Sequence, residues 1–190
     1  MNNHKHKFKT GLVVGKFYPP HRGHKYLIDT AKAQCEEVTV ILCVKKSELI
    51  PGNLRAEWLH KIHPDVYVKV VDDYKLADDD SEGWAEFTKQ ILGYTPDAVF
   101  TSEDYGDPYA KFLGSIHILV DKDRVTIPIS ATLVRSNPMK YSEFLEPCVR
   151  SYFAWRVAIV GAESTGTTTL SKQLAEHYKT SWVPEYGRTY

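Results

Sequence analysis

The chain has 190 residues, in which 24 Lys and Arg balance 24 Asp and Glu. This length suits one α/β domain of about 150 residues and leaves little for a second domain. The balanced charge excludes a global electrostatic field that would attract nucleic acid or an anionic membrane, so we expect neither as a partner. Any phosphate binding must therefore be local.

The sequence does not indicate secretion or membrane insertion. No apolar run reaches the ~20 residues of a membrane span, and residues 1–9 are polar and basic with no apolar stretch behind them. Cys35, Cys43 and Cys148 are an odd number, which favours reduced thiols over a disulfide framework. We expect a cytoplasmic protein with a flexible tail over residues 1–9.

Apolar segments alternate with amphipathic ones along the chain. Alternation of this kind predicts an α/β fold with a doubly wound parallel sheet and helices on both faces. In such sheets ligands bind beyond the carboxyl ends of the strands, here at loops 15–24 and 102–106. The predicted strands are Gly11–Val14, Val38–Val44, Val66–Val71, Ala98–Thr101 and Ile116–Leu119, and the predicted helices lie near His24–Gln34, Arg55–Ile62, Gly83–Leu92 and Tyr109–Leu113.

The loop Gly15–His24, with the sequence GKFYPPHRGH, joins the first predicted strand to the first predicted helix. Gly15 and Gly23 permit tight turning, and the two prolines between them keep the loop extended. His21 and His24 then lie at a helix N-terminus, where unpaired N–H groups and the helix dipole favour an anion. Without this context two such histidines could be zinc ligands or surface residues, and the surface interpretation would be favoured. We expect the anion to be a phosphate.

This loop resembles the GxFxPxHxGH signature of the nucleotidyltransferase superfamily, with every fixed position present. A second segment, Ile129–Arg135, resembles the ISxTxxR motif of the same superfamily. Together they imply a Rossmann-like nucleotidyltransferase domain over residues 10–154. The resemblance implies that ATP is bound by Gly15, Phe17, His21, Gly23, His24, Ser130, Thr132 and Arg135.

Beyond residue 154 the sequence changes character. Val157–Val160 predicts a buried strand, followed by the loop Gly161–Thr168 and a helix to about His177. The loop resembles a P-loop, but Thr167 stands where the GxxxxGK[ST] pattern has a lysine. Without that cation, and with the chain stopping at Tyr190, we expect residues 155–190 to be a truncated P-loop kinase-like segment without kinase activity.

A nucleotidyltransferase domain followed by a P-loop segment is similar to the bacterial bifunctional nicotinamide-nucleotide adenylyltransferase and ribosylnicotinamide kinase family. The stretches Thr101–Gly106 and Pro147–Tyr152 also fit that family. The resemblance implies transfer of AMP from ATP to nicotinamide mononucleotide, giving NAD and pyrophosphate. ATP and nicotinamide mononucleotide are then the partners, Mg²⁺ is carried by ATP, and the protein needs no metal ligands of its own. Some members carry an N-terminal DNA-binding domain, for which this chain has no room before its first strand.

The resemblance also gives each catalytic candidate a role. His24 would contact the α-phosphate, and His21 would contact the phosphate chain nearer the leaving group. Arg135, with Ser130 and Thr132, would hold the β and γ phosphates, and Lys16 would bridge the attacking and attacked phosphates. An in-line displacement at phosphorus requires such alignment and charge neutralisation, and no covalent chemistry from the protein.

Two residues are candidates for binding the acceptor. Trp84 offers an aromatic face on which a cationic nicotinamide ring would stack, although packing in the core explains it equally well. Asp104 follows the fourth predicted strand and is placed to meet a ribose hydroxyl, but a turn role is as plausible.

Two alternatives stay open at this point. The chain could be a transferase of the same superfamily, with the same fold and chemistry, that acts on pantetheine phosphate, a flavin mononucleotide or a cytidylyl acceptor. The chain could also be a non-catalytic nucleotide sensor, although a sensor has no need for transition-state donors such as His21, His24 and Arg135. The sequence leaves open the choice between nicotinamide and nicotinic acid mononucleotides, and the oligomeric state, a homo-oligomer included. The acidic cluster Asp72–Asp80 lacks calcium-loop spacing and predicts a solvated loop.

Overall fold

A computed structural model describes residues 6–72, 76–77 and 79–184. The chain divides into two compact units, residues 1–153 and residues 154–190. The first unit contains the parallel sheet and its helices, and the part of the second unit up to residue 184 contains one helix.

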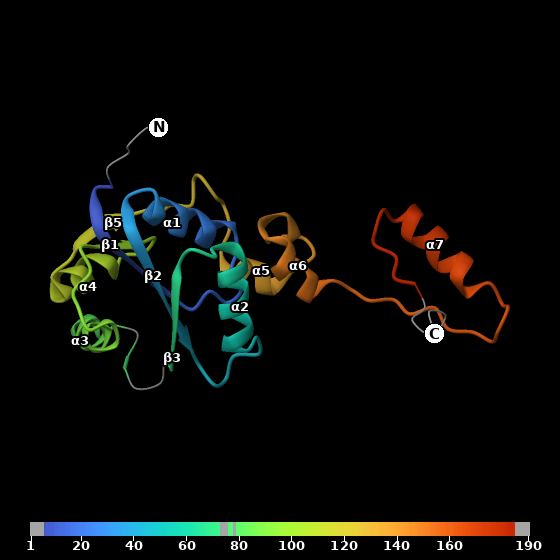
Figure 1. Cartoon of the computed structure of the whole chain (residues 1–190), viewed down its shortest axis with the longest axis horizontal. Coiled ribbons are helices and arrows are strands. Elements are labelled where there is room, and N and C mark those ends of the chain that lie inside the picture. The colour runs from blue at the N-terminus through green and yellow to red at the C-terminus, as the bar shows by residue number, and fades with distance from the viewer. Residues whose placement is uncertain (1–5, 73–75, 78, 185–190) are drawn as a thin grey trace. The chain divides into compact units, whose positions relative to one another are not determined.

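The first unit is built on a five-stranded parallel sheet with the order β3-β2-β1-β4-β5 (Figure 1). This confirms the predicted doubly wound α/β fold, since the central strand β1 pairs with β2 on one side and with β4 on the other. Because β1 begins at Phe8, two residues of the predicted tail belong to the sheet, and residues 1–5 lie outside the described residues. The strands are β1 Phe8–Gly15, β2 Cys35–Val44, β3 Tyr67–Asp72, β4 Ala98–Thr101 and β5 Ile116–Leu119.

Helices cover both faces of the sheet. Adjacent residues of a strand point to opposite faces, and both faces carry apolar side chains that must be buried. Val13 of β1 packs on the side that holds Ile28 and Leu59, whereas Leu12 packs on the side that holds Ala85 and Leu113. The first two helices, which carry Ile28 and Leu59, therefore cover one face, and the next two, which carry Ala85 and Leu113, cover the other. These helices are α1 Arg22–Lys32, α2 Gly52–Ile62, α3 Ser81–Leu92 and α4 Gly106–Leu113.

Local capping sets where these helices begin and end. The Asp80 carboxylate accepts from the Gly83 N–H at 2.9 Å at the start of α3, and α3 and α4 end at Gly93 and Gly114, which adopt left-handed φ values of 77° and 82°. All four predicted helices are present and begin two or three residues earlier than predicted. At α1 and α3 this is because the capping side chains of His21 and Asp80 precede the apolar pattern.

A third apolar cluster holds the short helices that follow the sheet, α5 Ala131–Ser136 and α6 Pro147–Phe153. Trp58 of α2, Val134 of α5 and Val149 of α6 are buried in it. A six-residue helix such as α5 has little stability of its own. This cluster therefore keeps α5, and the ISxTxxR segment that forms it, in place.

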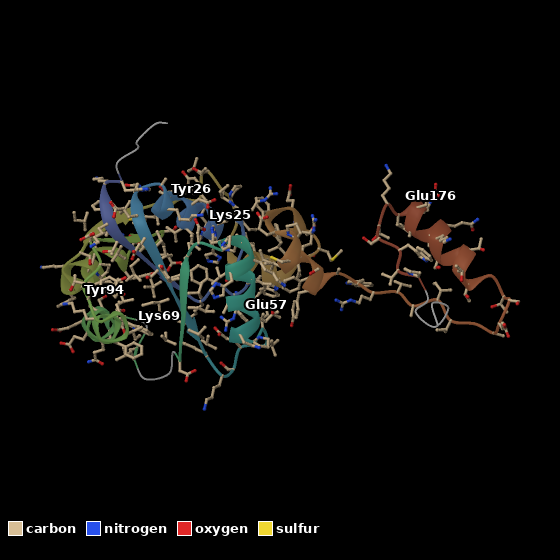
Figure 2. All side chains as sticks on the ribbon, viewed as in Figure 1. Lys25, Tyr26, Glu57, Lys69, Tyr94 and Glu176 are labelled. Carbon is tan, nitrogen blue, oxygen red and sulfur yellow. The ribbon has the colours of Figure 1, made fainter. Side chains whose placement is uncertain are left out.

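The outer helix surfaces carry charged side chains that pair one turn apart. Lys25 pairs with Asp29 on α1, and Glu57 pairs with Lys61 on α2 (Figure 2). Exposed pairs of this kind contribute about 0.3–0.5 kcal/mol each, so they add little to stability. Within the described ranges, no helix has the length and apolar character needed to cross a membrane.

In the second unit the predicted helix is present and the predicted strand is not. The helix is α7 Thr167–His177. Val157–Val160 forms no strand and is largely exposed, so the prediction of a buried strand is wrong. Strand residues need hydrogen-bonding neighbours and a covered face, and the described part of this unit provides neither. Within this unit Trp182 contacts α7, and its Nε1 donates to the Ser171 hydroxyl at 2.9 Å.

Cys35, Cys43 and Cys148 form no disulfide, and Cys35 and Cys43 are buried. Cys35 lies where β1 and β2 pair, and burial raises the pKa of its thiol to about 11. A Cβ added at Gly11 would lie 2.6 Å from the Cys35 sulfur and 3.3 Å from the Phe100 ring. Gly11 is therefore required by the close approach of the two strands.

We expect Gly11→Ala to lower the free energy of unfolding by about 1–3 kcal/mol, because the methyl group overpacks this contact. Urea denaturation of the full chain measures the change. The double variant Gly11→Ala/Cys35→Ala removes the sulfur and should lose less than the sum of the two single variants. Strictly additive losses would contradict the clash.

Candidate active site

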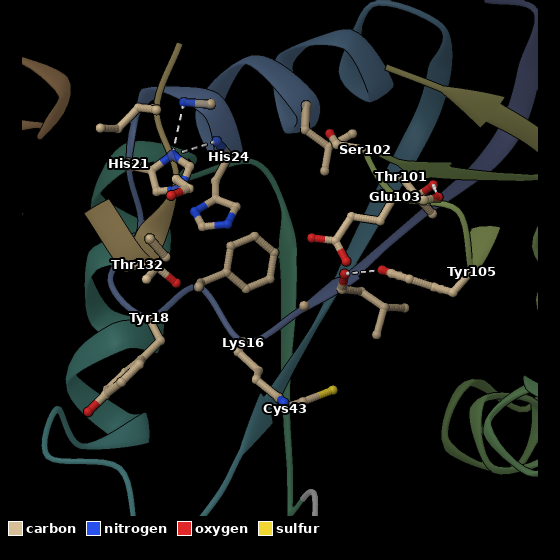
Figure 3. A pocket seen from close by; sticks show the side chains of 18 of the residues that line it. Lys16, Tyr18, His21, His24, Cys43, Thr101, Ser102, Glu103, Tyr105 and Thr132 are labelled. Atoms are coloured by element: carbon tan, nitrogen blue, oxygen red, sulfur yellow. Dashed lines mark hydrogen bonds between the residues drawn. The ribbon is translucent and has the colours of Figure 1, made fainter. Parts of the chain in front are cut away.

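One cavity of about 680 Å³ opens at the carboxyl ends of the strands. Its walls come from the loops that follow β1, β2, β4 and β5, with α1, α3 and α5 contributing their first turns. Figure 3 shows Lys16, Tyr18 and His21 on one side of this cavity and Glu103 and Tyr105 on the other. This is where the topology of a doubly wound sheet places a ligand.

The histidine pair is organised by the start of α1. The Nδ1 atom of His21 accepts hydrogen bonds from the N–H groups of Gly23, at 3.1 Å, and His24, at 3.4 Å (Figure 3). His21 is therefore the N-cap of α1, and because Nδ1 accepts, its neutral ring carries the proton on Nε2. A Cβ at Gly23 would lie 3.0 Å from the His21 ring, which explains the glycine between them.

The rings of His21 and His24 stack, with centroids 3.8 Å apart. Burial lowers the pKa of His21 to about 4 and holds the pKa of His24 well below its usual range, and the nearby Arg124 charge acts in the same direction. The Nδ1 atom of His24 is buried and has no hydrogen-bond partner in the described part of the chain. Both rings are thus neutral hydrogen-bonding groups near pH 7, and an anion beside them would favour their protonation.

The second motif contributes a guanidinium to the same cavity. Arg135 donates from Nη1 to the Tyr18 carbonyl and from Nη2 to the Thr132 hydroxyl at 3.1 Å. Ser130 caps α5 by accepting from the Leu133 N–H at 3.2 Å. Segments more than 100 residues apart in sequence are thereby joined.

The structure brings together all but one of the site residues predicted from the sequence. Trp84 lines the cavity, and its Nε1 donates to the Ala77 carbonyl at 2.9 Å, which fixes the orientation of the indole. The predicted residues that line the cavity are Gly15, Lys16, Phe17, His21, Gly23, His24, Trp84, Ser130, Thr132 and Arg135.

Asp104 is the exception. Its side chain is 84% exposed and forms an ion pair with Lys122, and it does not line the cavity. The neighbouring Glu103 and Tyr105 line it instead, and the Tyr105 hydroxyl donates to the Val14 carbonyl at 3.3 Å. The turn after β4 therefore presents the residues on either side of Asp104 to the cavity. The structure gives no support to the prediction that Asp104 binds substrate.

Arg124 is a cavity residue that lies outside both sequence motifs. It lies in the turn after β5 with a left-handed φ of 53°, and its N–H donates to the Asp121 carbonyl at 2.9 Å. The Asp121 carboxylate accepts from two further N–H groups in the same turn. The guanidinium lies 3.9 Å from Glu103. Backbone strain in a non-glycine residue is common at functional sites, but the sequence offers no motif that marks this position.

The described residues contain no group of three side chains suited to holding a metal ion. Of the acidic cluster, Asp73 and Asp78 lie outside the described residues, and Asp80 caps α3.

The parallel sheet and the Gly15–His24 loop at its central strand are those of a nucleotidyltransferase-type α/β domain. A family model described as cytidylyltransferase-like matches residues 12–137, and the chain belongs to that family. A second model, described as an AAA domain, matches residues 156–190 of the other unit.

The chain is similar to named proteins and to solved structures. The trifunctional NAD biosynthesis/regulator protein NadR of Escherichia coli K12 is 33% identical over 95% of this chain and 49% of its own length. A crystal structure of NadR with NAD and AMP-PNP has a TM-score of 0.77 at 23% identity, covering 96% of this chain and 57% of that one. A bifunctional NMN adenylyltransferase/ADP ribose pyrophosphatase from Francisella tularensis, solved with AMP and a manganese ion, has a TM-score of 0.53 at 14% identity over 90% and 55% of the two chains. The chain thus spans about half the length of the curated relative.

The depressed histidine pKa values predict a pH-dependent stability. An unfolded histidine titrates near 6.5, whereas His21 titrates at about 4 when folded, so the unfolded state binds more protons between these values. The stabilising effect is complete above pH 6.5 and is lost as the pH falls toward 4. We expect the free energy of unfolding from urea titrations to decrease over that range.

The matched variant is His21→Asn, because asparagine is also a good N-cap but does not titrate. Its free energy of unfolding should depend less steeply on pH, by up to ~1.4 kcal/mol per pH unit. An unchanged slope would mean that His21 titrates normally in the folded protein.

Proposed function

We propose that this chain transfers AMP from ATP to nicotinamide mononucleotide, producing NAD and pyrophosphate. The observation that carries the proposal is the convergence of the stacked His21 and His24 rings with Arg135 on one cavity of about 680 Å³. The similarity to NadR supports nicotinamide mononucleotide as the acceptor.

The reaction is an in-line displacement at phosphorus. An oxygen of the acceptor 5′-phosphate forms a bond to the α-phosphorus of ATP, and the bond from that phosphorus to the bridging oxygen of the β-phosphate breaks. Pyrophosphate leaves with the electron pair. The protein needs to align the two phosphates and to stabilise the charge that develops, which requires donors and cations in fixed positions.

The described contacts suit this task. In this proposal His24, at the start of α1, contacts the α-phosphate, and His21 donates its Nε2–H to the phosphate chain. The Arg135 guanidinium, oriented by Tyr18 and Thr132, holds the β and γ phosphates. Lys16 lines the cavity beside them and bridges the two reacting phosphates. Mg²⁺ bound to the ATP phosphates supplies further charge neutralisation.

Trp84 is the proposed platform for the nicotinamide ring. Its indole lines the cavity and is held by the hydrogen bond to Ala77 and by an edge contact with Phe87, whose ring centroid is 5.9 Å away. A fixed aromatic face stabilises a cationic ring without further ordering.

The activity test uses the full chain with Mg-ATP or Mg-CTP and a panel of acceptors, with products identified by mass. Nicotinamide mononucleotide should give NAD, and chelation of Mg²⁺ should stop the reaction. The other acceptors in the panel are pantetheine phosphate, flavin mononucleotide and nicotinic acid mononucleotide. A product formed from one of them would identify the corresponding alternative transferase. Ribosylnicotinamide should remain unphosphorylated, because Thr167 supplies no ammonium at the start of α7. No NAD above a no-enzyme control would disprove the proposed function.

We expect His24→Ala to lower kcat for NAD formation by about 10², because one preorganised donor is removed from the transition state. Circular dichroism and the thermal midpoint should show that the fold persists. Near-normal turnover at saturating ATP would remove His24 from the catalytic set.

We expect Arg135→Lys to weaken ATP binding by about tenfold, because an ammonium cannot reproduce the planar fork of the guanidinium. Titration calorimetry with ATP measures the loss, and binding of nicotinamide mononucleotide alone serves as the control. Equal ATP affinity in the two proteins would rule out contact between Arg135 and the triphosphate.

A further inference from the structure

Arg55 is a fully buried arginine that does not line the cavity. Its side chain, on α2, has 0% exposure. Nη1 donates to the Lys16 carbonyl at 2.6 Å, and Nη2 donates to the Glu48 carboxylate at the same distance. One guanidinium therefore ties the loop after β1 to the loop after β2.

The partner carboxylate belongs to the wall of the cavity. Glu48 lines the cavity and also accepts from the Lys45 N–H at 3.0 Å. A bare carboxylate here would repel a polyphosphate, and the Arg55 charge offsets it. Buried ion pairs are often no more stabilising than apolar residues of the same volume. The pair therefore calls for an explanation other than stability.

Tyr18 extends this network to the second motif. Its ring contacts two guanidinium groups, with the centroid 5.1 Å from Arg55 and 4.8 Å from Arg135. The Tyr18 hydroxyl accepts from the Leu49 N–H at 2.8 Å, and its carbonyl accepts from Arg135. These contacts restrain the Tyr18 ring. A shift of Arg55 would therefore move Tyr18, and with it the carbonyl and ring that Arg135 contacts.

We propose that Arg55 is a positioning residue that holds Lys16 and, through Tyr18, Arg135 in register for the triphosphate. This inference rests on the function proposed above for the same cavity. Arg55 acts on the loop backbone and contacts no substrate. Misplacement of reacting groups by about 1 Å can cost ~10² in rate, so a residue that fixes the Lys16 backbone has a large effect on turnover.

The chemistry of the side chain makes the proposal specific. A guanidinium reaches two acceptors at once and stacks on an aromatic ring, whereas an ammonium is a point charge on a flexible stem. Arg55→Lys keeps the buried charge but can serve only one of the two acceptors well. Arg55→Lys should therefore fold while losing the link between the two loops.

The test compares Arg55→Lys with Leu59→Ala, a control on the same helix. Leu59 is buried in the sheet core and does not line the cavity. We expect Arg55→Lys to lower kcat for NAD formation at least tenfold per folded molecule, and Leu59→Ala to keep kcat within twofold although its thermal midpoint falls. Equal kcat in Arg55→Lys and the parent chain would overturn the inference, as would an equal loss in both variants.

A double-variant cycle tests whether Arg55 acts through Lys16. Lys16→Ala removes the ammonium but leaves the carbonyl that Arg55 binds. If Arg55 positions that ammonium, Arg55→Lys should lower kcat much less in the Lys16→Ala background than in the parent chain. A loss of the same factor in both backgrounds would show that Arg55 does not act through Lys16.

Binding of Mg-ATP separates this inference from the proposed function. Its dissociation constant, from titration calorimetry, should rise several-fold in Arg55→Lys and stay unchanged in Leu59→Ala, whatever acceptor the enzyme uses. If the parent chain forms no NAD but these affinities differ as expected, the proposed acceptor is wrong and the positioning role stands. If the parent chain forms NAD and Arg55→Lys binds ATP and turns over normally, the positioning role is wrong.

Discussion

The hydrogen bonds from the first turn of α1 to the His21 imidazole are the constraint on which the rest of the site depends. By accepting from Gly23 and His24, the ring ends the loop, starts the helix and fixes its own tautomer. His24 follows on the same helix and stacks on His21. A single capping interaction thus orients both imidazoles, and because β1 is the central strand, it does so at the switch point of the sheet.

A neutral protein can bind a polyanion when its cations are placed locally. The two histidines are held neutral by burial, so the cations that line the cavity, Lys16, Lys45, Arg124 and Arg135, provide its positive charge. This division has a physical advantage. Neutral rings can pack at van der Waals distance without repulsion, while arginines remain charged at any physiological pH.

Local patterns in the sequence predicted most of the fold and the position of the Gly15–His24 loop at the cavity. The strand and helix pattern and the His21–His24 spacing are short-range signals, and a helix N-terminus converts such spacing directly into geometry. Asp104 and Val157–Val160 show what local patterns cannot predict, namely contacts that depend on distant parts of the chain. The turn after β4 leaves the Asp104 side chain exposed beside Lys122, and an apolar run forms a strand only when neighbouring strands are available to pair with it.

Arg55 and Arg124 could not be found from the sequence for a related reason. The contact of Arg55 with the Lys16 carbonyl joins residues 39 positions apart on different elements, and nothing near Arg55 in the sequence marks it as more than a helix residue. Its importance arises only when α2 packs beside the loop after β1. The motif residues supply the groups that face the cavity, and buried residues outside the motifs help to fix their positions. A chain can therefore keep every motif residue and still lose the register of its site.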